Sequence, residues 1–166
     1  MIPSDHFVKF YNEVFKFLER KGPEAIAEYY RTISRHQESH CLKLFTEKGL
    51  QGMHEYWSKI KIEENCDCDM WFDGPDVLKF AMHGCPSLGK VLDNDAGASA
   101  IYCNHCPGWV LPIMTKAGFY CVYDLVATDI PRCQMAIFKH RADAEKELAL
   151  VRKRHPGHPE LVAANL

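Results

Sequence analysis

The chain has 166 residues, 47% of them hydrophobic, and a formal net charge of −2. This length and composition are typical of one globular domain. Lys and Arg form no long run, which argues against a nucleic-acid partner. The start of the sequence lacks the pattern of a signal peptide, and no apolar stretch is long enough to cross a bilayer. We therefore expect a cytoplasmic protein with no membrane partner.

The first third of the chain predicts helices. Ser4 is a suitable N-cap, and apolar residues follow at helical spacing to Leu18, before Gly22-Pro23 ends this helix and begins the next. The helical pattern then continues to Gly49. A third helix is expected from Leu50 to Ile60.

The middle and the end of the chain predict two β-hairpins. Apolar and polar residues alternate over 66–72, a turn follows at Asp73-Gly74-Pro75, and a second strand is expected over 77–83. Residues 119–126 and 133–138 have the composition of a second hairpin. The sheet is therefore expected to be antiparallel.

Three other segments complete the predicted fold. A connecting helix is expected over about 104–116, interrupted near Pro107 and Pro112 and ended by Gly118. A C-terminal helix is expected over 141–151, and residues 154–166 are expected to form a mobile tail. The predicted fold class is α+β, with N-terminal helices packed on a sheet of two β-hairpins. We expect one domain over 1–166, made of a helical part (1–62), an α+β core (63–153) and the tail.

Seven of the eight cysteines lie between Cys66 and Cys133. In a reducing compartment such clustering indicates metal binding or catalysis rather than disulfides. The alternative is that buried thiols serve as small apolar side chains, which is the interpretation we favour for Cys41.

The most specific motif is Cys103-Asn104-His105-Cys106, at the start of a predicted helix. Unpaired N–H groups and the helix dipole favour thiolates at this position, and thiolates bind metal or attack electrophiles. A tetrahedral zinc site needs further ligands, which Cys121, Asp124 and Cys133 could supply. We predict a zinc site of Cys103, Cys121 and Cys133, with Cys106 or Asp124 as the fourth ligand.

A second candidate motif is His83-Gly84-Cys85-Pro86, where a predicted strand leaves the sheet. If a pocket lies here, Cys85 is a candidate nucleophile and His83 or His105 is its general base, because a thiol needs a nearby base to ionise. The alternative is a structural turn with a half-buried histidine. Trp109, just after the Cys-x-x-Cys motif, could form a wall of a ligand pocket.

The stretch from these two motifs to Arg132-Cys133-Gln134-Met135 resembles the L-2-amino-thiazoline-4-carboxylic acid hydrolase-like family. It is also similar, more distantly, to 4-vinyl-reductase-type small-molecule-binding domains. The resemblance covers roughly the C-terminal half. It implies a fold of N-terminal helices on an antiparallel sheet, often as a dimer, and an activity of ring-opening hydrolysis of a thiazoline. The similarity to the second group also implies a structural zinc held by Cys103, Cys121 or Asp124, and Cys133. The chain departs from the family pattern at two places. Pro131-Arg132 stands before Cys133 where the pattern has Gly-Asp, and Cys121-x-x-Asp124 stands where the pattern has an acidic residue, any two residues and a cysteine.

Three functions remain open from the sequence. The first is a hydrolase that acts on a C=N bond of a small sulfur or nitrogen heterocycle. The second is a non-catalytic, zinc-stabilised module that binds a small molecule. The third is an accessory protein for a metal or corrinoid cofactor. In each case we expect a small-molecule ligand or substrate and allow for a homodimer.

Overall fold

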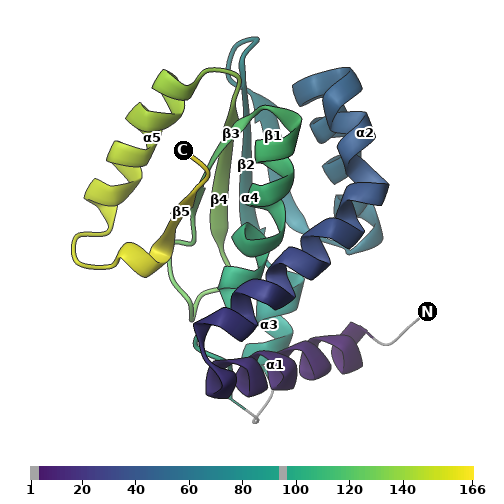
Figure 1. Ribbon diagram of the computed structural model, residues 1–166, viewed down its shortest axis with the longest axis vertical. Coiled ribbons are helices and arrows are strands. Elements are labelled where there is room, and N and C mark those ends of the chain that lie inside the picture. The colour runs from purple at the N-terminus through teal and green to yellow at the C-terminus, as the bar shows by residue number, and fades with distance from the viewer. Residues whose placement is uncertain (1–3, 94–96) are drawn as a thin grey trace.

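Five strands between Asp67 and Ala164 form one antiparallel sheet, and helices from both ends and the middle of the chain pack against it (Figure 1). The computed structural model describes residues 4–93 and 97–166. It confirms the predicted α+β fold with N-terminal helices. The elements are α1 (Ser4–Lys21), α2 (Pro23–Glu63), β1 (Asp67–Phe72), β2 (Val77–Gly84), α3 (Pro86–Leu92), η1 (Tyr102–Asn104), α4 (His105–Ala117), β3 (Tyr120–Asp124), β4 (Cys133–Phe138), α5 (Arg141–Arg154), η2 (Pro159–Leu161) and β5 (Val162–Ala164).

The two expected hairpins are present and lie side by side in the sheet. The strand order is β1-β2-β4-β3-β5, and every neighbouring pair is antiparallel. The hairpins join through β2 and β4, where Met82 pairs with Cys133 and Val77 with Phe138. This register brings the start of β4 next to the end of β2, and therefore next to the Cys85 turn.

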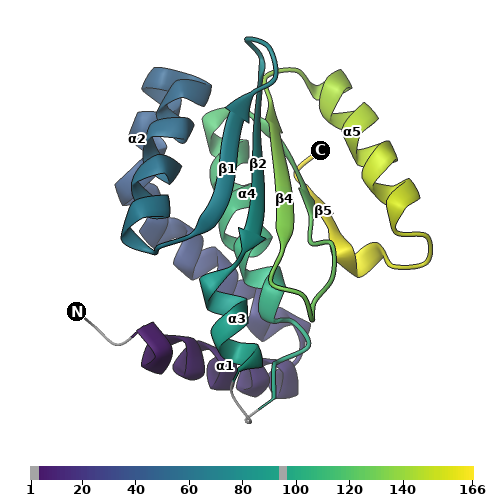
Figure 2. The same ribbon diagram turned by 180° about the vertical axis from the view of Figure 1, so that it is seen from behind.

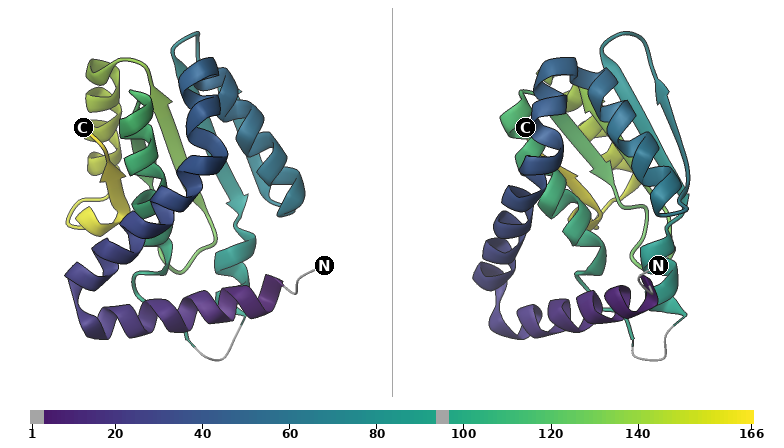
Figure 3. Two further views of the ribbon diagram at one scale, coloured as in Figure 1. Left: turned by 45° about the vertical axis from the view of Figure 1, so that its right-hand side comes forward. Right: turned by 90° about the vertical axis from the view of Figure 1, so that its right-hand side faces the viewer.

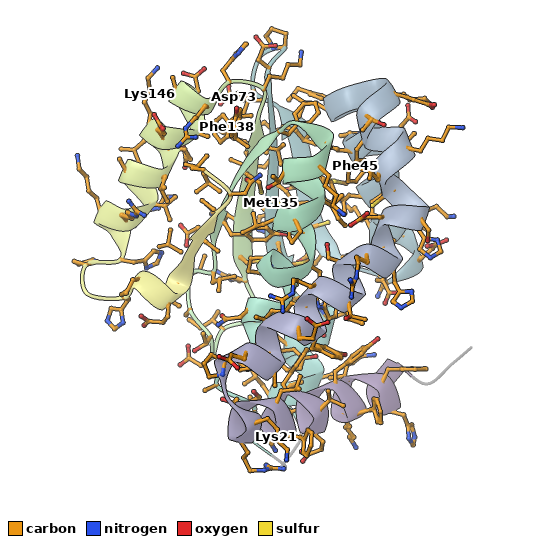
Figure 4. The ribbon with its side chains drawn as sticks, viewed as in Figure 1. Lys21, Phe45, Asp73, Met135, Phe138 and Lys146 are labelled. Carbon is orange, nitrogen blue, oxygen red and sulfur yellow. The ribbon has the colours of Figure 1, made fainter. Side chains whose placement is uncertain are left out.

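Helices cover the two faces of the sheet unequally. Helices α2 and α4 cover one face, where Phe45, Met114 and Ile137 are almost fully buried. Helix α5 covers part of the other face, with Val122 and Phe138 in the core beneath it. Figure 2 shows the strands from the side opposite α4, and Figure 4 shows Phe45 on α2 and Phe138 beside α5. In the part of the chain that the structure describes, no helix is both long enough and apolar enough to span a bilayer.

Glycines interrupt α2 and end α4 as predicted, but the prolines of α4 do not break that helix. Gly49 interrupts α2 with φ 58° and ψ −138°, a conformation that is open mainly to glycine, so the two expected helices meet at this kink. Gly118 ends α4 in the left-handed conformation. The expected interruption of α4 is absent, because Pro107 lies in its first turn and the helix continues through Pro112.

The C-terminal segment differs from the prediction of a mobile tail. Residues 162–164 form β5, which pairs with β3 at the edge of the sheet. Asn165 strengthens this pairing, since its side-chain oxygen accepts the backbone N–H of Cys121 and its side-chain amide donates to the carbonyl of Phe119. These contacts give the segment an ordered position that its composition does not indicate.

Helix α1 runs across one end of the molecule and contacts α2 and α3 rather than the strands (Figure 3). The buried side chain of Asn12 ties α1 to a distant segment. Its amide donates to the carbonyl of Gly97 at 2.7 Å, and its oxygen accepts the N–H of Ser99 at 2.8 Å. Glu19 accepts the hydroxyl of Ser99 at 2.7 Å. The N-terminal helix is therefore fixed to the stretch that leads into the Cys-x-x-Cys motif.

Candidate functional site

The turn from η1 into α4 sets the orientation of His105. The backbone N–H and the ring Nδ1 of His105 both hydrogen-bond to the carbonyl of Tyr102. A carbonyl oxygen can only accept, so Nδ1 carries the proton and Nε2 keeps its lone pair. Nε2 lies 3.3 Å from Sγ of Cys106, whose S–H therefore donates to it. The result is a thiol, an imidazole and an orienting carbonyl in series.

Burial keeps this pair uncharged. Burial lowers the pKa of His105 to about 4, although the bond to the Tyr102 carbonyl partly opposes this effect. Burial also raises the pKa of Cys106 to about 11. At neutral pH the resting pair is thus a neutral imidazole and a neutral thiol.

Cys106 lies at the centre of a cluster of thiols. Burial raises the pKa of Cys103 to about 12 and raises the pKa values of Cys85 and Cys133, and negative charge on Cys106 raises all three further. The four residues come from the end of β2, from η1, from the first turn of α4 and from the start of β4. All are free thiols. Cys66, just before β1, belongs to the same cluster, because burial raises its pKa and negative charge on Cys85 and Cys106 raises it further. The fold therefore gathers five of the seven clustered cysteines.

Aromatic rings from the N-terminal helices enclose His105. Phe15 of α1 is fully buried and stacks on the His105 ring with centroids 5.4 Å apart, and Trp109 lies 4.6 Å away. The ring of Tyr30, from α2, packs against Gly108, where an added Cβ would lie 2.5 Å from Cδ2 of that ring. Only glycine allows this close approach.

Two polar atoms in this aromatic shell have no partner in the described part of the chain. They are the hydroxyl of Tyr30 and Nε1 of Trp109, and both are buried. Burial raises the pKa of Tyr30, and negative charge on Cys106 raises it further. Buried donors without an acceptor are uncommon, and these two leave unused hydrogen bonds in the aromatic shell.

The other predicted catalytic residues are placed differently. Cys85 is the N-cap of α3, where its sulfur accepts the N–H of Leu88 at 3.4 Å. His83 is half exposed, and its Nε2 lies 2.9 Å from a carboxylate oxygen of Asp69. His105 faces Cys106. The structure therefore brings a histidine to Cys106 and gives Cys85 no imidazole partner.

The predicted zinc ligands do not fit a common metal centre. Cys121 pairs with Ile137, four residues along β4 from Cys133, which places the two cysteines about 13 Å apart along the strand direction. Asp124 lies on the opposite face of β3, and its oxygens accept bonds from Val126, Arg154 and His155. Among residues 4–93 and 97–166, no three His, Cys, Asp or Glu side chains are arranged to hold a metal ion.

Four surface cavities formed by the described residues have no cysteine in their lining. One cavity of about 450 Å³ is lined by Asn104, Pro107, Gly108 and Leu111, which form one stripe of α4. Cys106 lies about half a turn away from that stripe and is not part of the lining of this cavity.

Comparison with known proteins gave no family model, no curated relative and no solved structure that is similar to this chain.

Sequence reasoning missed two parts of this site. It assigned Cys106 to metal binding rather than to a pair with His105, although the adjacent His-Cys in the motif was a signal. It also missed Phe15 and Tyr30, which lie far from the motif in sequence. Their helical spacing indicates only a buried face and not what that face covers.

Proposed function

We propose that the protein is a thiol-dependent hydrolase that opens a small sulfur and nitrogen heterocycle at its C=N carbon, with 2-aminothiazoline-4-carboxylate as the type of substrate. The supporting observation is the 3.3 Å contact between Cys106 Sγ and His105 Nε2, with Nδ1 held by the Tyr102 carbonyl. In this arrangement Cys106 is the nucleophile, His105 Nε2 is the base that faces it, and the Tyr102 carbonyl orients the histidine ring.

In the first half of the reaction, Cys106 sulfur bonds to the ring carbon between sulfur and nitrogen. The S–H proton passes to His105 Nε2, and the C=N electron pair moves to the protonated ring nitrogen. The C=N bond then re-forms as the bond to the ring sulfur breaks. That sulfur leaves with the proton from His105, and the opened substrate stays on Cys106 as an isothiouronium.

In the second half, a water molecule adds to the same carbon and gives a proton to His105. The bond between that carbon and Cys106 breaks, and the sulfur recovers the proton from His105. The proton that the substrate brought is released, and the product carries a urea group. Overall, the substrate and one water molecule are converted into the ring-opened product, and the enzyme returns to its starting state.

The uncharged site fits a substrate that is cationic at its reacting end. A protonated C=N carries positive charge, and positive charge beside Cys106 would offset the burial that raises the pKa of this thiol. Thiolate would then form only when substrate is bound. The buried free thiol would be unreactive at rest.

The test is turnover of 2-aminothiazoline-4-carboxylate by wild type, Cys106→Ala and His105→Gln. We expect wild-type turnover, no turnover by Cys106→Ala, and a loss of about 100-fold or more for His105→Gln. Cys41→Ala is the matched control, because Cys41 is a buried cysteine in α2 outside the thiol cluster, and this variant should keep its activity. An inactive wild type, or an active Cys106→Ala, would contradict the proposal.

A second candidate function is non-catalytic binding of a small molecule. The partnerless Tyr30 hydroxyl and Trp109 Nε1 favour it, because an acceptor on a ligand would satisfy both without any bond being broken. Binding of the same compound by Cys106→Ala with wild-type affinity, and no turnover by either protein, would favour this function over hydrolysis.

A further inference from the structure

A cavity lies at the free edge of the sheet, between α5 and the C-terminal segment. Its volume is about 610 Å³, which is in the range of small-molecule sites. Figures 1 and 2 show β5 at this edge of the sheet, with α5 beside it. We call it the β5 cavity. Neither Cys106 nor His105 lines it, so it is separate from the site of the proposed function.

The walls of the β5 cavity are mostly apolar. Leu148 of α5 and Val162 of β5 belong to the core beneath α5, whereas Leu111 belongs to the core beneath α4. All three side chains line the cavity, which therefore wraps around the edge of β5. Among the described residues, no acidic side chain lines it. The cavity thus has apolar walls and no negative side chain.

Arg152 brings positive charge to this cavity. It lies in the last turn of α5, one turn after Leu148, so both side chains lie on the same side of the helix. In the described part of the chain, its guanidinium has neither a hydrogen bond nor an ion pair. The other basic residue in the lining, His155, is already bound to Asp124 through Nε2. An unpaired guanidinium beside apolar walls suits a carboxylate, which it can bind through two parallel N–H···O bonds.

The backbone of β5 adds a second donor. The carbonyl of Leu161 accepts the N–H of Leu125, and the N–H of Asn165 donates to β3. Backbone groups of successive residues in a strand point to opposite sides, so the N–H of Ala164 points away from β3. Within the described residues this N–H has no acceptor. Because Ala164 lines the cavity, its N–H can donate to an anion that Arg152 binds.

We propose that the β5 cavity binds a small monocarboxylic acid with an apolar chain. The carboxylate accepts hydrogen bonds from Arg152 and from the N–H of Ala164, and the chain lies against Leu111, Leu148 and Val162. Inorganic phosphate is a poorer fit, because it has no apolar part to cover these walls. Arg152 is itself exposed to solvent, so we expect modest affinity, with a Kd of about 1 mM for an acid of ten heavy atoms.

An NMR titration of the nitrogen-15-labelled chain with octanoate tests the proposal. We expect saturable shifts of the backbone amides of Leu148, Val162 and Ala164, with a Kd of about 1 mM. Octanamide has the same chain without the charge, and it should bind at least about fivefold more weakly. Inorganic phosphate should give no saturable shift of these amides up to about 20 mM.

Two neighbouring substitutions test the role of Arg152. Arg152→Gln should weaken octanoate binding at least about fivefold and leave octanamide binding unchanged. Lys153→Gln is the matched control, because it makes the same charge change at an exposed residue outside the lining, and it should bind octanoate like wild type. The dispersion of each amide spectrum shows whether the variant is folded.

Four results would overturn the proposal. They are the absence of a saturable Ala164 shift up to about 20 mM octanoate, equal octanoate binding by Arg152→Gln and wild type, equal binding of octanamide and octanoate, and phosphate binding as tight as octanoate binding. None of these measurements involves turnover by Cys106. Failure of this proposal and failure of the hydrolase proposal are therefore distinguishable.

Discussion

The buried, uncharged state of His105 should make stability depend on pH in a defined window. Burial lowers the pKa of His105 from 6.5 to about 4. The unfolded chain therefore binds a proton below pH 6.5 that the folded chain does not bind until about pH 4. Unfolding free energy should fall as pH drops through this window, by about 3 kcal/mol in all. Urea denaturation at pH 7, 6, 5 and 4.5 measures this slope.

The control is His105→Phe, which keeps an aromatic ring between Phe15 and Trp109 but cannot titrate. Other groups also titrate in this range, so the quantity to compare is the difference in slope between the two proteins. We expect the variant to be less stable at pH 7, because the bond to Tyr102 is lost, and to lose less stability on acidification. Equal slopes in the two proteins would refute the assignment of His105 as a neutral, buried base.

Three substitutions test the packing around the site by thermal and urea denaturation. Tyr30→Phe removes a buried hydroxyl without a partner, so stability should stay constant or rise by up to about 1 kcal/mol, and a clear loss would show that the hydroxyl has a partner in solution. Gly108→Ala should cost about 1–3 kcal/mol, because its Cβ would meet the Tyr30 ring, and Tyr30→Ala in the same chain should remove most of that cost. Asp124→Asn should cost about 3 kcal/mol, because the variant loses the buried negative charge and presents an NH2 donor to Arg154 or His155 in place of one acceptor oxygen; a loss under about 1 kcal/mol would contradict this.

Features that depend on local pattern could be predicted from the sequence. Alternation over 66–72 and 77–83, with Asp73-Gly74-Pro75 between them, determines a hairpin with little help from the rest of the chain. Gly49 and Gly118 likewise mark positions that need a backbone conformation open mainly to glycine. β5 could not be found in this way, because three residues carry too little pattern and Asn165 stabilises them through residues more than 40 positions away.

The site was predictable in its location but not in its pairing. The clustering of cysteines predicted that Cys103, Cys121 and Cys133 meet at one place, and the structure gathers Cys103 and Cys133 with Cys106 but leaves Cys121 apart. Which thiol receives the histidine depends on the orientation of one ring, and the Tyr102 carbonyl sets that orientation. The position of Cys121 depends on strand register, which pairs it with Ile137 rather than with a residue near Cys133.

The bonds from Asn12 to Gly97 and Ser99 have a consequence for the order in which the protein assembles during synthesis. Helix α1 leaves the ribosome well before its polar partners and the ring that Phe15 covers, which lie more than 80 residues later. Phe15 can meet Tyr29 and Tyr30 of α2 early, but Asn12 and the face of Phe15 that covers His105 wait until η1 and the first turn of α4 have emerged. A helix made early is thus among the last to complete its native contacts, and a chaperone would find its target there in the nascent chain.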